Sequence, residues 1–230
     1  MQSIVKSHLV ARNKRSQPSR HLWPWQKWAL EQMHPSNSET ILDLGCGRGE
    51  LARHLIAKMG SSGDIVAVDP SPELLHEAEM LSHHDTERRI QWMIGTHHQI
   101  FYRDKSFDKI LSEFVLDSVD IDETFSELQR LINNHGHVVL LCYGTVNNQL
   151  ARMARRFWNG VVSYHRFVGL PVRQYLSNSL DLESLQSLLP SYHFSHVSSQ
   201  KWFGGFIYGL TIEYHDPSIH TVPASKCDVD

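Results

Sequence analysis

The sequence is poor in cysteine and contains no long apolar run. Its three cysteines, Cys46, Cys142 and Cys227, are far apart and form no C-x-x-C pair, which excludes a disulfide framework and favours a reducing compartment. No apolar stretch approaches the roughly 20 residues that a membrane-spanning helix needs, and no secretory signal is present. Histidine doublets such as His83-His84 lack H-E-x-x-H spacing, so no metal site is expected.

Acidic residues are missing from the start of the chain. The first thirty residues carry six Lys or Arg and no Asp or Glu before Glu31, whereas the whole chain has a net charge of −3. That weak overall charge offers no general field for nucleic acid, which is not expected as a partner. Residues 1–20 are predicted to form a flexible basic arm. A transit peptide is the alternative, so the expected location is the cytoplasm or, if the arm is cleaved, an organelle matrix.

Apolar strand-like runs alternate with helical patterns between residues 40 and 143. The runs include "TILDL", "DIVAVD", "IQWMI", "FDKILSE" and "GHVVLLCY", and the helical patterns include "ELARHLIAKM" and "DETFSELQRLI". Such alternation is typical of βαβ units with a parallel sheet buried on both faces. The length of 230 residues fits one α/β domain, assigned to residues 21–216, followed by a flexible tail at 217–230.

The alternation of strand-like and helical patterns stops after Tyr143. Residues 146–180 are too long for a simple connection and rich in aromatic residues and arginine, so they are interpreted as an insertion that forms an acceptor pocket or a lid. A helix capped by Asp181 is expected next. Two strand-like runs on either side of Gly204-Gly205 then predict a β-hairpin.

The stretch "ILDLGCGRGELARHLI" (residues 41–56) reads as a buried strand, a glycine-rich turn and a helix. This arrangement lets the backbone approach a ligand closely at the start of a helix. Dinucleotide-binding turns share the device, but here the third glycine comes one residue early and Asp43 stands two positions before Gly45. A carboxylate there would repel a pyrophosphate and suits an ammonium group, so a dinucleotide oxidoreductase is disfavoured.

This stretch resembles the first motif of the class I S-adenosylmethionine-dependent methyltransferases. The resemblance implies a Rossmann-like seven-stranded sheet in the order 3-2-1-4-5-7-6, with strand 7 antiparallel and helices on both faces, and S-adenosyl-L-methionine as cofactor. Asp69 ends the next strand, 24 residues beyond Gly45, where an acid can accept both ribose hydroxyls; capping of the following helix is its alternative role. The resemblance also implies that Pro70 packs against the adenine.

Two further segments complete the resemblance. "IGTHHQIF" keeps Gly95 but has Thr96 where many members carry an acid, which leaves Thr96 or His97 to bind the adenine edge. "SFDKILSEFVLDSVD" is similar to the family's fourth segment and places Ser112 and Glu113 beside the glycine turn. The resulting cofactor-binding set is Asp43, Gly45, Cys46, Gly47, Gly49, Asp69, Pro70, Thr96, His97, Ser112 and Glu113.

The methyl acceptor is the open question. "RQYLSNSLDLESLQSLLPSYHF" is similar to a stretch of quinone-biosynthesis C-methyltransferases, which implies a small hydrophobic or aromatic acceptor and O- or C-methylation; a carrier-bound malonyl ester is a rival. Such an acceptor can require a general base, for which His97, His98 and His165 are candidates. An RNA or protein methyltransferase and a non-catalytic cofactor-binding scaffold remain the alternatives.

Overall fold

The computed structural model describes residues 22–82, 89–145 and 181–218, with five further positions between 149 and 157. The predictions for the arm at 1–20, for most of the 146–180 insertion and for nearly all of the tail therefore lie outside the described residues. In the described part, no helix is both long enough and apolar enough to cross a membrane.

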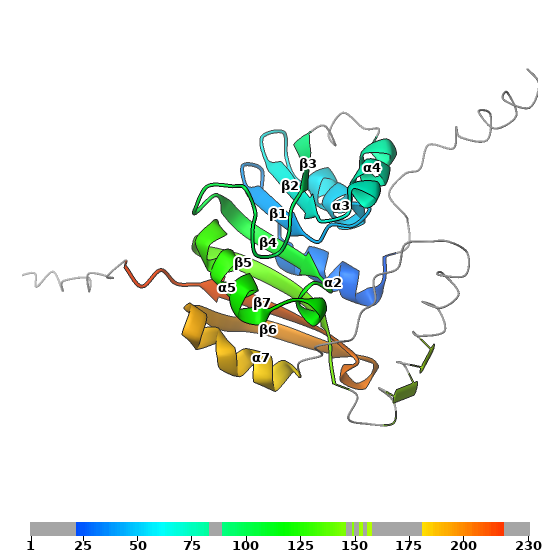
Figure 1. Ribbon diagram of the computed structural model, residues 1–230, viewed down its shortest axis with the longest axis vertical. Coiled ribbons are helices and arrows are strands. Elements are labelled where there is room, and N and C mark those ends of the chain that lie inside the picture. Colours follow the sequence, from blue (N-terminus) through cyan, green and yellow to red (C-terminus); the bar gives the residue numbers. More distant parts are fainter. Residues whose placement is uncertain are drawn as a thin grey trace, which may run out of the picture.

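A seven-stranded sheet forms the centre of the molecule, in the order β3-β2-β1-β4-β5-β7-β6 (Figure 1). Its strands are β1 (Thr40–Leu44), β2 (Asp64–Asp69), β3 (Ile90–Ile94), β4 (Phe107–Glu113), β5 (Ile132–Tyr143), β6 (Phe194–Trp202) and β7 (Ile207–Tyr214). β1 to β5 pair in parallel, and β7 is antiparallel to both β5 and β6. The predicted strand order and the hairpin at Gly204-Gly205 are confirmed.

The helices cover both faces of the sheet, because alternate strand residues point to opposite sides. Leu42 and Leu44 of β1 pack in one core with residues of α5 (Ile121–Leu131) and α7 (Leu182–Leu188). Ile41 packs in the other core with residues of α2 (Pro24–Met33) and α3 (Glu50–Lys58). A further helix, α4 (Pro72–Leu81), lies beside α3 over β2 and β3 (Figure 1). Both cores are continuous and apolar.

Helix starts follow the capping residues of the sequence. Ser71, Asp120 and Asp181 cap α4, α5 and α7 by accepting a hydrogen bond from the backbone N–H three residues later. The cap at Asp181 was predicted. β5 differs from expectation because it begins at Ile132, before the apolar run "GHVVLLCY"; Ile132 already pairs with Phe107, and a register irregularity precedes the next pair.

Candidate functional site

The glycine-rich turn between β1 and α3 lies at the carboxyl ends of the parallel strands, where open α/β sheets bind ligands. Gly45 and Cys46 donate backbone hydrogen bonds to the carbonyl of Val68, which ties the turn to β2. The backbone N–H of Gly47 donates to Asp69 Oδ2 over 2.9 Å. Asp69 therefore stabilises the backbone conformation of the glycine-rich turn.

The glycines of this turn have two different physical roles. Gly47 has φ +54°, and a Cβ atom added there would meet nothing within 4 Å, so its outer face is open to a ligand. Gly49 has φ +68°, and a Cβ there would come within 2.2 Å of the Trp92 ring. Gly49 thus allows close packing of α3 against β3, while Gly47 provides the open approach that the sequence pattern predicted.

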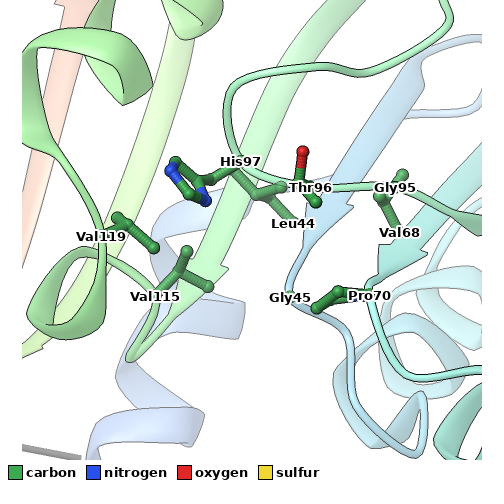
Figure 2. Close-up of a pocket in the computed structure, with 9 residues that line it drawn as sticks. All are labelled: Leu44, Gly45, Val68, Pro70, Gly95, Thr96, His97, Val115 and Val119. Carbon is green, nitrogen blue, oxygen red and sulfur yellow. The ribbon is translucent and has the colours of Figure 1, made fainter.

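Two pockets meet at Gly45. The first has a volume of about 150 Å³ and is lined by Leu44, Gly45, Val68, Pro70, Gly95, Thr96, His97, Val115 and Val119. Figure 2 shows Pro70 next to Gly45, and the His97 imidazole on the side of Val115 and Val119. The lining is apolar apart from Thr96 and His97, and it contains no carboxylate. We call it the neutral pocket.

The second pocket has a volume of about 230 Å³ and is lined by Gln26, Asp43, Gly45, Cys46, Gly47, Arg48, Glu50, Leu51, Glu113 and Phe114. Three of these residues are carboxylates: Asp43, Glu50 and Glu113. We call it the acidic pocket. Asp43 is 2% exposed, and its Oδ2 is buried without a hydrogen-bond partner among the described residues.

Burial raises the pKa of both inner carboxyls of the acidic pocket. The pKa of Asp43 rises to about 8, first because the group is desolvated and then because Glu113 and Asp69 repel its charge. Desolvation likewise raises the pKa of Glu113 to about 7, although hydrogen bonds from Gln26 and Trp25 act in the opposite direction. Two acids held in this way are stabilised in their charged form by a cation.

Gln26 holds the Glu113 carboxylate in place. Its Nε2 donates to both carboxylate oxygens, over 3.1 and 3.2 Å, and its Oε1 accepts from the backbone N–H of Trp23. Gln26 lies on α2, 87 positions from Glu113, so no local sequence pattern indicated this contact. Sequence reasoning also missed Glu50, Phe114, Val115 and Val119 as lining residues.

The predicted cofactor residues divide between the two pockets. Asp43, Gly45, Cys46, Gly47 and Glu113 line the acidic pocket, and Gly45, Pro70, Thr96 and His97 line the neutral one. Gly49, Asp69 and Ser112 line neither pocket; Asp69 is completely buried and Ser112 is 3% exposed. The candidate base His98 lies over a separate surface hollow, and His165 is outside the described residues.

The two pockets fit a ligand that is neutral at one end and cationic at the other. The unpartnered Asp43 oxygen and the open face of Gly47 meet this requirement in the structure itself. S-adenosylmethionine carries an uncharged adenine at one end; at the other, a sulfonium and an ammonium group outweigh the single negative charge of its carboxylate. A dinucleotide pyrophosphate would face three carboxylates, which its charge disfavours.

Known proteins resemble this chain in both sequence and fold. Residues 42–140 match the methyltransferase domain family. A 2-phytyl-1,4-naphtoquinone methyltransferase of Nostoc sp. is 28% identical, over 68% of this chain and 71% of the relative. A ubiquinone/menaquinone biosynthesis C-methyltransferase of Legionella pneumophila is 25% identical, over 92% of this chain and 88% of the relative.

The solved structures support the fold. An S-adenosylmethionine-dependent methyltransferase of Aquifex aeolicus has a TM-score of 0.61 at 13% identity, covering 82% of this chain and 88% of its own. The geranyl diphosphate C-methyltransferase of Streptomyces coelicolor has a TM-score of 0.64 at 10% identity, covering 82% and 78%. The domain match, the strand order and the sequence relatives together support a class I S-adenosylmethionine-dependent methyltransferase.

Proposed function

We propose that this enzyme methylates a ring carbon of a small, hydrophobic quinol-type acceptor, with Glu113 as the general base. The named relatives support the acceptor class, because their names specify naphthoquinone, ubiquinone and menaquinone methylation. The single observation that carries the proposal is the half-buried Glu113 carboxyl, which lines the acidic pocket directly beside a set of aromatic side chains.

The aromatic side chains extend from the acidic pocket to the protein surface. Phe114 lines the pocket and meets Trp25 edge-on at 6.4 Å between ring centroids. Trp25 stacks on Trp23 at 5.1 Å and meets Phe203 edge-on at 6.1 Å. Trp25 itself is buried core, but Trp23 and Phe203 are 49% and 45% exposed. An apolar aromatic acceptor could pack against these two rings while its reactive end enters the pocket.

The cofactor and the acceptor would use different groups of the site. Pro70, Thr96 and His97 would hold the adenine in the neutral pocket, and Asp43 with Glu50 would face the cationic end. Asp69 would accept the ribose hydroxyls with the lone pairs that remain after its two oxygens accept from the backbone N–H groups of Gly47 and Ser71. When bound, the cofactor supplies an electrophilic methyl group.

Glu113 would act on the acceptor. A carboxyl with a pKa of about 7 is well matched to take a proton from a quinol hydroxyl near neutral pH, which makes the ring carbon nucleophilic. The new carbon–carbon bond replaces a carbon–hydrogen bond, and the ring proton leaves to solvent. His97 and His98 lie at the neutral pocket and outside it, so the structure favours Glu113 over them for this role.

The test is a methyl-transfer assay on the full chain with labelled S-adenosylmethionine and a short-chain demethylated naphthoquinol kept reduced. We expect a C-methylated product, and Glu113→Gln should lower kcat by about 10²–10⁴-fold. The matched control is Glu79→Gln, on an exposed acid of α4 that lines neither pocket. An O-methylated product, or an unchanged kcat in Glu113→Gln, would refute the proposed base and reaction.

The remaining expectations concern partners and location. A small-molecule acceptor is favoured over RNA, whose binding would fall steeply with salt, so a salt titration with RNA tests the alternative. We propose the cytoplasm as the location on the sequence alone, because its few, widely spaced cysteines are typical of a reducing compartment.

A further inference from the structure

A cluster of metal-binding side chains lies beside the neutral pocket. His97 and His98 come from the turn that follows β3, and Glu123 comes from the first turn of α5. One ligand atom of each residue lies within 4.8 Å of the other two. The spacing of histidines in the sequence predicted no metal site, because the third side chain is 25 positions further along the chain.

The distances approach those of a coordination shell. His97 Nε2 and His98 Nδ1 are 3.2 Å apart, whereas two imidazole nitrogens bound to one tetrahedral zinc ion are separated by about 3.3 Å. The nearest Glu123 oxygen, Oε2, is 4.0 Å from His97 Nε2 and 3.7 Å from His98 Nδ1. A small rotation of this exposed side chain would bring its oxygen into the same shell.

The donor set indicates which metal would bind. Two imidazoles and one carboxylate suit zinc and similar divalent transition metals, whereas magnesium and calcium prefer oxygen ligands throughout. The side chains are 18%, 45% and 60% exposed for His97, His98 and Glu123. The site is thus anchored on its inner side and open to solvent on the other, where a water molecule can complete the coordination.

We propose that His97, His98 and Glu123 form a binding site for a divalent transition metal, zinc above all, at the edge of the cofactor site. Three protein ligands leave the fourth position of a tetrahedral ion open. The ion would join the turn after β3 to the start of α5. His97 and Val119, one from each of these segments, line the neutral pocket, so a bound ion would fix two of its walls.

A second cluster of the same composition serves as a control. His135, Glu213 and His215 also place their ligand atoms within 4.8 Å of one another, on β5 and at the end of β7. Here, however, His135 is 66% exposed and lacks the anchoring of His97, which is 18% exposed. In addition, His135 Nδ1 already pairs with Glu213 Oε1 over 3.0 Å, and His215 Nε2 hydrogen-bonds Ser195 Oγ over 2.8 Å. Neither His135 nor His215 lines the two pockets of the cofactor site, so their loss should leave that site intact.

The experiment uses the full chain without a polyhistidine tag, stripped with a chelator and titrated with Zn²⁺ by calorimetry and with Co²⁺ by visible absorption. We expect one tight equivalent, weakened at least 10-fold in His98→Ala and in Glu123→Gln and unchanged in His215→Ala. Thermal melting checks that each variant is folded. No binding by the wild type, or loss only in His215→Ala, would overturn the assignment.

The link to the cofactor site is tested separately and rests on the cofactor assignment. S-adenosylhomocysteine is titrated with and without saturating Zn²⁺, and we expect a several-fold tighter Kd with the metal, with the reciprocal effect on zinc affinity. His98→Ala should remove the effect while keeping the metal-free Kd. An equal Kd in both conditions would overturn the link. Absence of S-adenosylhomocysteine binding in both would instead contradict the cofactor assignment.

Discussion

The neutral and acidic pockets share Gly45 but differ in chemistry. The neutral pocket is closed by Val115 and Val119 and has no carboxylate in its lining, whereas the acidic pocket has Asp43, Glu50 and Glu113. A site that were only a hollow at the end of the sheet would have no reason to divide its charges in this way. The division matches a cofactor with an uncharged base at one end and two cationic groups at the other.

The carboxyls of the acidic pocket also destabilise the ligand-free protein when they are charged. Burial keeps the pKa of Asp43 near 8 and that of Glu113 near 7, so near neutral pH both groups are partly protonated until a cation arrives. The neutral pocket causes no such destabilisation, because its lining contains no carboxyl group. Desolvation lowers the pKa of His97 in the neutral pocket, so above neutral pH cofactor binding should depend on pH through the acidic pocket.

The largest effect on cofactor binding is expected when the glycine-rich turn between β1 and α3, which contributes Gly45 to both pockets, is destabilised. Asp69→Ala removes the acceptor for the N–H groups of Gly47 and Ser71, each bonded over 2.9 Å. A lost hydrogen bond to a charged group costs about 1.5–3 kcal/mol, so the free energy of unfolding without ligand should fall by about 3 kcal/mol. Affinity for S-adenosylhomocysteine should fall by roughly 100-fold or more. Denaturant titration and calorimetry measure the two.

Asp64→Ala is the matched control, because Asp64 begins the same strand but is exposed. A ribose contact alone would predict weaker binding with unchanged stability. That outcome would show that the Asp69 hydrogen bonds seen here do not support the turn.

A comparison of Asp43 with Gln26 shows which features of the site the sequence could predict. The alternation of apolar runs and the hairpin at Gly204-Gly205 identify the fold, because each signal is local in the chain. Asp43 and the turn glycines were likewise visible as one contiguous motif. Gln26 was not, because its role depends on α2 packing across the end of β4, which no local pattern specifies.

The cofactor-binding roles expected of Gly49 and Asp69 stay predictions, and the structure adds a local role for each: Asp69 accepts from the backbone N–H of Gly47, and Gly49 leaves room for a neighbouring ring. The expected close approach of a ligand applies to Gly47, while Gly49 makes room for Trp92. A sequence pattern shows that a side chain is excluded, but only the folded neighbours show what excludes it.

Asp43→Asn should affect the acidic pocket alone. The amide keeps the shape of the side chain but cannot pair with a cation, so affinity for S-adenosylmethionine should fall by about 10–100-fold at pH 8.5. Affinity for adenosine should stay within about 2-fold, because adenosine lacks the cationic end. Calorimetry with both ligands makes the comparison, with Glu79→Gln, at an exposed position outside both pockets, as control. An equal loss for both ligands would show that the two pockets are not chemically independent.

The raised pKa values predict how stability depends on pH. A third acid, Asp117, lies outside both pockets, is buried and accepts from the backbone N–H of Tyr143; desolvation raises its pKa to about 7. The pKa values of Asp43, Glu113 and Asp117 are about 8, 7 and 7 in the folded protein but near 4 when unfolded, so between these values the folded state binds more protons. As far as these groups are concerned, the stability of the ligand-free protein should be greatest below about pH 4 and should fall as the pH rises from there to about 8. Each group contributes up to about 1.4 kcal/mol per pH unit while it stays protonated only in the folded state.

Denaturant titration between pH 5.5 and 8.5 measures this slope, and Asp43→Asn should make it shallower. Saturating S-adenosylmethionine should reduce it further, because the cation favours the ionised carboxyls. A stability that rises with pH over this range would contradict the assignment of buried, protonated acids to the pocket.

The smallest effect is expected in the neutral pocket. Thr96 stands where many related enzymes carry an acid, and it lines the pocket with Pro70 and His97. Thr96→Val keeps the shape and removes only the hydroxyl, whose hydrogen bond to the adenine edge would be worth about 0.5–1.5 kcal/mol. Affinity for adenosine and for S-adenosylmethionine should therefore fall equally, by about 2–10-fold. A loss confined to S-adenosylmethionine would place the cationic end of the cofactor here and reverse the orientation proposed for the two pockets.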